Sequence, residues 1–295
     1  MREGMTVAHL ILLALKLSII VMVFALGLKT TPSDWLWLLR RPGLLARSLL
    51  AMNVVMPAFA IAVVELMRLR HPVAIALIAL SLSPVPPLLP RRQAKAGGET
   101  PYAVDLLAIA AVLSVVWIPI AIEIVARIAG APLAVSPWTV AELVALMILV
   151  PLLAGTVTGA YARGLAQRIG PRLSRAAGVV LLIGLVLILF KSWRAALGLV
   201  GDGTLLALIG FIVAGLIVGH LLGGPQAEGR SVLALATASR HPGIAATIAH
   251  LNFPDERAAP AAILLYLVLG ALVSLPYIRW REHRREAAGP ERPPR

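Results

Sequence analysis

Cysteine is absent from the 295-residue chain, and charged and aromatic residues are scarce, at 14% and 5% of the sequence. The lack of cysteine excludes disulfide bonds, thiolate metal sites and cysteine nucleophiles. The scarcity of charge excludes an ordinary soluble surface, because about a quarter of the residues of a soluble domain are charged. Hydrophobic residues make up 59% of the chain and the mean hydropathy is +0.89, which indicates a membrane protein.

Nine apolar runs of about 20 residues follow one another, and this is the length that a helix needs to cross a bilayer. The runs are continuous rather than alternating, and lipid cannot satisfy an open backbone, so helices are predicted and barrel strands are not. The predicted fold is an all-α polytopic membrane protein. The nine spans are 8–28, 44–66, 72–90, 101–126, 139–161, 175–193, 203–224, 229–251 and 258–279.

The net charge of +13 reflects membrane topology, because the basic residues lie between the apolar runs. They do not alternate with aromatic residues on a polar face, so nucleic acid is not a predicted partner. With the C-terminus inside, 18 Lys and Arg fall on the inner side and 7 on the outer side. The positive-inside rule then predicts an N-out, C-in protein of the bacterial inner (plasma) membrane, with a basic, disordered cytoplasmic tail at 281–295.

Proline interrupts two of the apolar runs. The first break is the run SPVPP at 83–87, with Pro84, Pro86 and Pro87, and the second is RHPG at 240–243, with Pro242. Each proline removes a backbone donor and disfavours helical geometry in the residue before it. Both helices are therefore predicted to unwind at membrane depth, and a simple kink absorbed by neighbouring side chains is the alternative.

The two breaks occupy matching places in two halves of the chain. Pro84 and Pro242 are 158 residues apart, and each break lies in the second-to-last span of a group of four and a group of five. Interrupted helices in corresponding positions indicate inverted repeats with a transport site where they cross. We predict a first repeat at 1–126, which has lost its first helix, and a second repeat at 127–280.

Two segments carry a family resemblance. The run GLKTTPSD at 27–34, followed by RRP at 40–42 and by Met56-Pro57, resembles the first conserved stretch of the bile acid:sodium symporter family. The run RHPGIA at 240–245 resembles that family's crossing-helix motif, usually Gln-Asn-Ser-Gly or Arg-Asn-Pro-Gly. The resemblance implies a secondary transporter with a panel domain, a core domain and two unwound helices that cross at the substrate site.

The sodium-site residues of that family are largely replaced. Sodium-coupled members carry a Glu four residues before the Gln of the motif, and here these positions hold Ala236 and Arg240. The Gln before the Met-Pro of the second span corresponds to Met52, with Asn53 one place away. Sodium needs hard oxygen ligands. The resemblance therefore implies weakened or absent sodium coupling, no other cofactor and no metal held by side chains.

Arg240 carries most of the functional hypothesis. A guanidinium within a span costs about 2.5–3.5 kcal/mol on insertion scales, so it is usually paired, solvated or functional. We expect Arg240 to replace the missing ion and to bind a small organic anion, with His241 as a further donor or proton switch and free N–H groups near Gly243. The other predicted cavity residues are Ser83, Asn53, Thr237 and Ser239, although Ser and Thr also bond back to their own helices.

A structural role for Arg240, as the partner of a buried carboxylate, is the alternative. Asp105 and Glu123 are the candidate partners, and 18 residues of helix hold them about 27 Å apart, so only one can reach Arg240. Asp105 is also a possible proton carrier. Glu123 is expected to extend toward the outer interface.

Two GxxxG pairs, Gly155 with Gly159 and Gly215 with Gly219, predict close helix packing. Catalytic signatures are absent: there is no Gly-Lys-Ser/Thr phosphate loop, no His-Glu-x-x-His and no Gly-x-Ser-x-Gly, so no enzyme is predicted. The predicted function is secondary transport of a small organic anion by alternating access, with that anion and the bilayer as partners. A true sodium symporter with backbone carbonyl ligands, and a non-transporting receptor or assembly module, are the alternatives.

Overall fold

The computed structural model of the chain describes residues 2–29, 35–129, 138, 141–142 and 145–288, and these residues form helices and short connections with no strand among them. The helices in chain order are α1 (Arg2–Gly27), α2 (Trp35–Leu39), α3 (Pro42–Leu49), the π-helix η1 (Leu50–Val55), α4 (Met56–Met67), α5 (His71–Leu82), α6 (Leu89–Lys95), α7 (Thr100–Ala129), the π-helix η2 (Ala145–Leu149), α9 (Val150–Tyr161), α10 (Arg163–Gly198), α11 (Thr204–Leu222), α12 (Ala227–Ala238), α13 (Pro242–Asn252) and α14 (Ala259–Ala288).

The all-α polytopic fold is confirmed, and the count of nine spans remains a prediction. Four continuous helical stretches are long and apolar enough to cross a membrane: 42–67, 100–128, 204–222 and 259–287. Three shorter apolar stretches accompany them, at 13–27, 71–82 and 145–161. Part of the predicted span 139–161, and residues 30–34 of the first family segment, lie outside the described residues.

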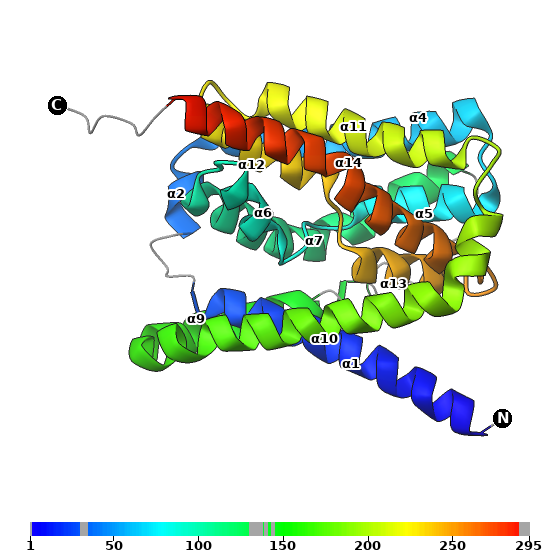
Figure 1. Cartoon of the computed structure of the whole chain (residues 1–295), viewed down its shortest axis with the longest axis horizontal. Coiled ribbons are helices and arrows are strands. Elements are labelled where there is room, and N and C mark those ends of the chain that lie inside the picture. The colour runs from blue at the N-terminus through cyan, green and yellow to red at the C-terminus, as the bar shows by residue number, and fades with distance from the viewer. Residues whose placement is uncertain (1, 30–34, 130–137, 139–140, 143–144, 289–295) are drawn as a thin grey trace.

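The helices form two groups. Figure 1 shows α1, α9 and α10 together along one side of the molecule, which we name the three-helix layer. The π-helix η2 runs directly into α9, and the other helices form what we name the larger body. Within the layer, Gly155 and Gly159 of α9 face α1, and a Cβ at position 159 would lie 2.7 Å from the Leu28 carbonyl oxygen. The close packing predicted from this GxxxG pair is confirmed.

The second GxxxG pair acts in the same way inside the larger body. A Cβ at Gly215 of α11 would lie 2.7 Å from the Cα of Ala238, and Gly219 faces Ala234. This close approach encloses α12, whose residues 231–238 are all buried. The helix that leads to the second proline break is therefore the centre of the larger body.

Both proline-bearing runs leave helical geometry inside the larger body. α5 ends at Leu82, Ser83 is extended, and α6 begins only at Leu89. α12 ends at Ala238, Ser239 is extended, and α13 begins with Pro242 as its first residue. Proline suits that position because the first N–H of a helix has no helical partner.

The prediction of a disordered tail at 281–295 is wrong for residues 281–288. α14 continues without interruption to Ala288. Arg, Glu and Ala are good helix formers and extend a helix that the span has already nucleated. Arg281 also donates to Ser231 Oγ at 2.7 Å and to the Ala227 carbonyl, which holds this part of α14 against α12. Residues 289–295 lie outside the described residues.

Candidate functional site

The two interrupted runs touch each other through their unwound backbone. The N–H of His241 donates to the carbonyl of Pro84 at 2.9 Å, so the second break lies directly on the first. A backbone bond between segments 157 residues apart satisfies groups that neither helix can use internally. We name this contact the crossing; it consists of residues 83–84 and 239–242.

Arg240 lies at the crossing and is only 2% exposed. Its Nη2 donates to the Met52 carbonyl at 2.8 Å, and its Nη1 donates to the Ser83 carbonyl at 3.2 Å. Its Nε has no hydrogen-bond partner among the described residues. The guanidinium therefore joins η1, the end of α5 and the start of α13 in one buried polar cluster.

Proline explains why both carbonyls are available. In the π-helix η1 the Met56 N–H bonds to the Ala51 carbonyl five residues back, so the next donor in this ladder would be residue 57. Residue 57 is proline and has no N–H, which leaves the Met52 carbonyl without its helical partner. Ser83 has already left helical geometry, and its carbonyl also lacks a helical donor. Arg240 supplies hydrogen bonds that the proline-interrupted helices cannot make.

The proposed ion pair between Arg240 and Asp105 or Glu123 is not found. Asp105 is fully buried, and its Oδ2 accepts from the Leu38 N–H at 3.0 Å. Glu123 pairs with Arg127 one helical turn away, at 2.9 Å. Among the described residues no ion pair includes Arg240. The charge of Arg240 is bound by backbone dipoles rather than by a carboxylate.

His241 and Gly243 have positional roles that the structure makes explicit. His241 is 5% exposed, and its Nδ1 accepts from the Ile244 N–H at 3.3 Å, so the ring caps the start of α13. A Cβ at Gly243 would lie 2.9 Å from Ile19 Cδ1, which means that α13 begins against α1 of the three-helix layer. The crossing thus reaches the boundary between the larger body and the layer.

Of the other predicted site residues, two have hydroxyl groups that bond to their own helices and two are half-buried neighbours of the Arg240 cluster. Ser83 Oγ donates to the Leu80 carbonyl and Thr237 Oγ1 donates to the Leu233 carbonyl, both at 2.8 Å, so each hydroxyl bonds back to its own helix. Asn53 and Ser239 are half-buried and neighbour, along the chain, the Met52 carbonyl and Arg240.

Sequence reasoning missed Tyr266 of α14. Its hydroxyl donates to the Ala238 carbonyl at 2.7 Å, which is the last carbonyl of α12 before the crossing. The ring is 2% exposed. A lone tyrosine within an apolar span is the signal that could have indicated it, because a buried phenol needs a hydrogen-bond partner.

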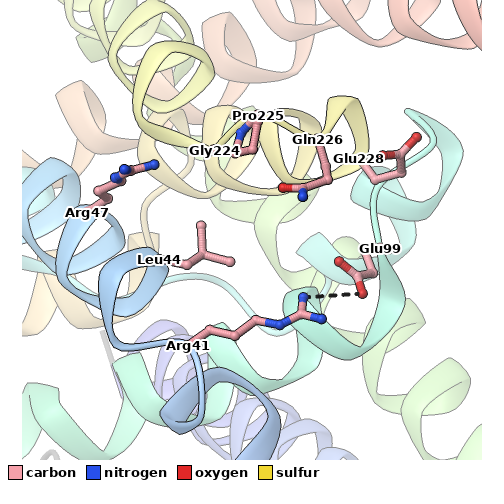
Figure 2. A pocket seen from close by; sticks show the side chains of 8 residues that line it. All are labelled: Arg41, Leu44, Arg47, Glu99, Gly224, Pro225, Gln226 and Glu228. Carbon is pink, nitrogen blue, oxygen red and sulfur yellow. Dashed lines mark ion pairs between the residues drawn. The ribbon is translucent and has the colours of Figure 1, made fainter.

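A cavity of about 460 Å³ is lined by charged and uncharged residues, none of which is a predicted site residue (Figure 2). Arg41 and Glu99 face each other across it at 3.9 Å, and Glu228 stands nearby. Burial raises the pKa of the Glu99 carboxyl, against the opposing charge of Arg41 and with a further contribution from Glu228. These residues come from loops predicted to face the inside.

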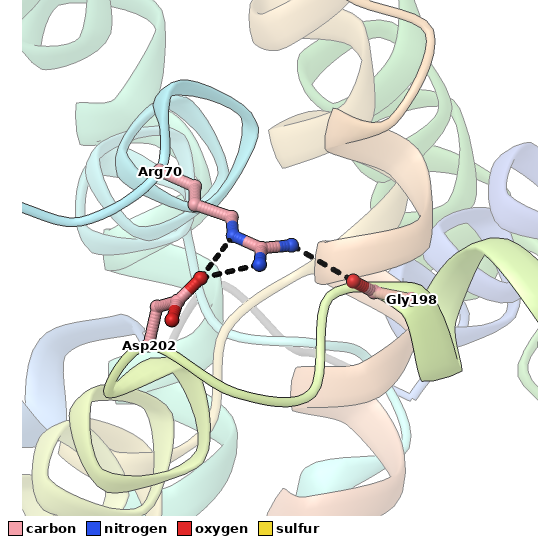
Figure 3. Close-up of polar contacts among 3 residues, drawn as sticks. All are labelled: Arg70, Gly198 and Asp202. Atoms are coloured by element: carbon pink, nitrogen blue, oxygen red, sulfur yellow. Dashed lines mark hydrogen bonds and ion pairs between the residues drawn. The ribbon is translucent and has the colours of Figure 1, made fainter.

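A second polar contact joins the layer to the larger body at loops predicted to face outside. Arg70, at the start of α5, donates through Nε to Asp202 at 2.6 Å and through Nη1 to the carbonyl of Gly198, the last residue of α10, at 2.9 Å (Figure 3). Both charged side chains are about half exposed. An exposed pair of this kind contributes about 1 kcal/mol or less, so it fastens the two groups only weakly.

Long apolar helices, two interrupted helices in contact and a layer packed on a larger body are the features of a polytopic membrane transporter. Residues 16–222 match the Sodium Bile acid symporter family, and the chain belongs to that family. The family resemblance is thereby confirmed, although the match does not include the segment 240–245, and membership indicates a membrane transporter of the bile acid symporter type. The matched stretch ends before the second interruption. A comparison with curated proteins finds no match.

Proposed function

We propose that the protein is a secondary transporter of a small organic anion, in which Arg240 takes the place of a mobile sodium ion at the crossing. One observation carries this proposal: a buried guanidinium, unpaired with any acid among the described residues, binds two backbone carbonyls where the interrupted helices meet. Carbonyl oxygens are the hard ligands that sodium requires. Because Arg240 already occupies two of them, a sodium symporter that relies on backbone ligands is the less favoured alternative.

The uncompensated charge of Arg240 supports an anionic substrate. A buried cation without a counter-ion is unfavourable by several kcal/mol in effective terms, and a bound anion would remove that penalty. A guanidinium has five N–H donors, and the Nε of Arg240 has no partner among the described residues, so donors remain for a carboxylate or sulfonate, which suit the guanidinium fork. His241, through Nε2, and the N–H of Gly243 would supply further donors, whereas the Ile244 and Ala245 N–H groups already donate to His241.

The burial of these groups supports alternating access. Arg240 and His241 are 2% and 5% exposed, so an anion can reach them only when the packing around the crossing opens. The contact of Gly243 with Ile19 lies between the larger body and the three-helix layer. We infer that these two groups of helices move relative to each other, in the roles of core and panel.

The chain offers a direct test of this motion, because it contains no cysteine. A Cβ at Gly178 of α10 would lie 3.6 Å from Leu88 Cδ2, so in a Leu88→Cys, Gly178→Cys variant a short thiol-reactive cross-linker can join layer and body. A Cβ at Gly184 would lie 3.0 Å from Leu15 Cγ, and in the matched Leu15→Cys, Gly184→Cys variant the same cross-linker joins two helices within the layer. A reducible bis-methanethiosulfonate cross-link on the first pair should stop transport reversibly, and the same cross-link on the second pair should not.

The proposal as a whole is tested by uptake into proteoliposomes with sodium replaced by choline. Equal uptake in the two media is expected, and loss of uptake in choline would instead favour sodium symport. Counterflow of a labelled anion separates transport from the receptor alternative, because a receptor binds without exchange. The predicted inner-membrane location with N-out, C-in topology and the repeats at 1–126 and 127–280 remain part of the proposal.

A further inference from the structure

Tyr266 of α14 lies at the second proline break, and its hydroxyl supplies a hydrogen bond that the backbone cannot make there. In a continuous α-helix the carbonyl of residue 238 would accept from the N–H of residue 242. Residue 242 is proline and has no N–H, so the Ala238 carbonyl, the last of α12, needs another donor. The Tyr266 hydroxyl donates to this carbonyl at 2.7 Å, and Tyr266 is only 2% exposed.

The first proline break is capped from within its own segment. The Leu80 carbonyl would accept from residue 84, which is also proline. Here the donors are the hydroxyl of Ser83, at 2.8 Å, and the N–H of Ser83, at 3.1 Å. Ser83 therefore caps its own helix, whereas Tyr266 reaches the end of α12 from another helix. A donor on another helix also fixes where α12 ends relative to that helix.

The Tyr266 ring is held in place by a neighbouring aromatic side chain. It packs edge-on against Phe211 of α11, with 6.1 Å between the ring centroids, and Phe211 is fully buried. The hydroxyl also interacts with the backbone of Arg240, so one fixed oxygen contacts the chain on both sides of Ser239. Ser239 is the extended residue at which α12 ends, and the two contacts hold the residues before and after it.

We propose that Tyr266 is a positioning residue for Arg240: its hydroxyl fixes the point at which Arg240 leaves α12 and thereby aims the guanidinium at two backbone carbonyls. The guanidinium reaches the Met52 and Ser83 carbonyls at 2.8 and 3.2 Å, and both distances depend on where the Arg240 backbone is held. An arginine side chain has many rotamers, so a fixed backbone reduces the ordering that a bound anion must impose. This inference rests on the proposed function for the role of Arg240 in anion binding, but its test does not require transport.

The test is a double-mutant cycle of Tyr266→Phe and Arg240→Ala, measured as melting temperatures of the purified full-length protein. Tyr266→Phe keeps the ring against Phe211 and removes only the hydroxyl. In the wild type it should lower the melting temperature by about 6 °C, because the Ala238 carbonyl loses its donor and Arg240 loses its fixed position. In the Arg240→Ala background only the first loss remains, so the shift should be about 3 °C. Equal shifts in the two backgrounds would overturn the proposal, because Tyr266 would then only cap α12.

Tyr277→Phe is the matched control on the same helix. The Tyr277 hydroxyl also donates to a carbonyl of α12, that of Arg230 at 3.4 Å, but near the start of that helix and away from the crossing. Its removal should shift the melting temperature by the same amount with and without Arg240. A dependence on Arg240 as large as that of Tyr266→Phe would contradict the proposal, because the coupling would not be specific to the crossing.

Modification of arginine by phenylglyoxal gives a second measurement, which does not need the Arg240→Ala protein to fold. The rate at Arg240 is measured by mass spectrometry of peptides, with the half-exposed Arg70 as the internal reference. Tyr266→Phe should raise this rate about fivefold, since the loss of one hydrogen bond changes a local opening equilibrium by about that factor. Tyr277→Phe should leave it unchanged. An unchanged rate in Tyr266→Phe would contradict the positioning role, whereas a failure of the wild type to take up anions would refute only the proposed function.

Discussion

Replacing Arg240 by alanine tests whether its side chain stands in a cation site. The variant removes the hydrogen bonds to Met52 and Ser83, which leaves two buried carbonyls without donors. Each unsatisfied carbonyl is unfavourable by about 1–3 kcal/mol. The variant also removes a buried charge that has no acidic partner, which is favourable by a similar amount. The two effects oppose each other, so the Arg240→Ala protein should fold.

Sodium should then stabilise the variant and not the wild type. The two free carbonyls would face the space left by the guanidinium, and hard oxygen ligands suit sodium. For a dissociation constant of about 10 mM, 200 mM sodium raises the free energy of unfolding by about 1.8 kcal/mol. In a chain of this size that corresponds to an increase of about 3 °C in the melting temperature.

The assay is thermal unfolding of the purified protein in sodium chloride and in choline chloride at equal ionic strength. Arg70→Ala is the matched control, because Arg70 also donates to a backbone carbonyl, that of Gly198, but at an exposed position. For Arg70→Ala, and likewise for the wild type, the melting temperature in sodium chloride should equal that in choline chloride. The reasoning is refuted if Arg240→Ala shows no sodium-specific shift, or if the wild type shows the same shift.

Three further predictions follow from the described contacts. Gly155→Leu should lower the melting temperature strongly, because its side chain would enter the backbone of α1, whereas Gly164→Leu, at a position with open space, should not. Burial raises the pKa of Glu99, so the contribution of its protonated form to stability is present below the ordinary pKa and is lost as pH rises through the raised value. Between pH 4 and pH 7 the free energy of unfolding, measured by chemical denaturation, should therefore fall less in Glu99→Gln than in the wild type. Asp105→Asn should leave the pH profile of uptake unchanged, because Asp105 holds the Leu38 N–H, and a lost pH dependence would identify Asp105 as the proton carrier.

The helical content and the importance of Arg240 could be inferred from the sequence, because both follow from local chemistry. Continuous apolar runs permit only helices in lipid, and an arginine within such a run needs an explanation. Proline chemistry likewise explains why α5 ends at Leu82 and why α13 begins at Pro242. None of these inferences requires knowledge of which helices are neighbours.

The partners of Arg240 could not be inferred in this way. Met52 is 188 residues away and contributes a backbone atom, which a side-chain pattern does not reveal. Its carbonyl lacks a helical donor because η1 is a π-helix, in which the donor five residues later would be Pro57. A side-chain pattern does not show where a helix changes to π geometry. The predicted acidic partner, Asp105 or Glu123, is not found, because Asp105 accepts from the Leu38 N–H and Glu123 pairs with Arg127. Backbone carbonyls instead accept hydrogen bonds from the guanidinium without neutralising its charge.

A tethered cation also changes the energetics of transport. A mobile sodium ion contributes the free energy of its gradient, whereas Arg240 stays with the protein and contributes none. Without a coupling ion, moving one negative charge inward against a potential of 100 mV, inside negative, requires about 2.3 kcal/mol, and moving it outward releases the same amount. The proposed mechanism therefore favours export of the anion or its exchange for another anion. Vesicles with an imposed potassium diffusion potential can decide this, because reversing the potential should reverse net flux for uniport and leave a one-for-one exchange of equal charges unaffected.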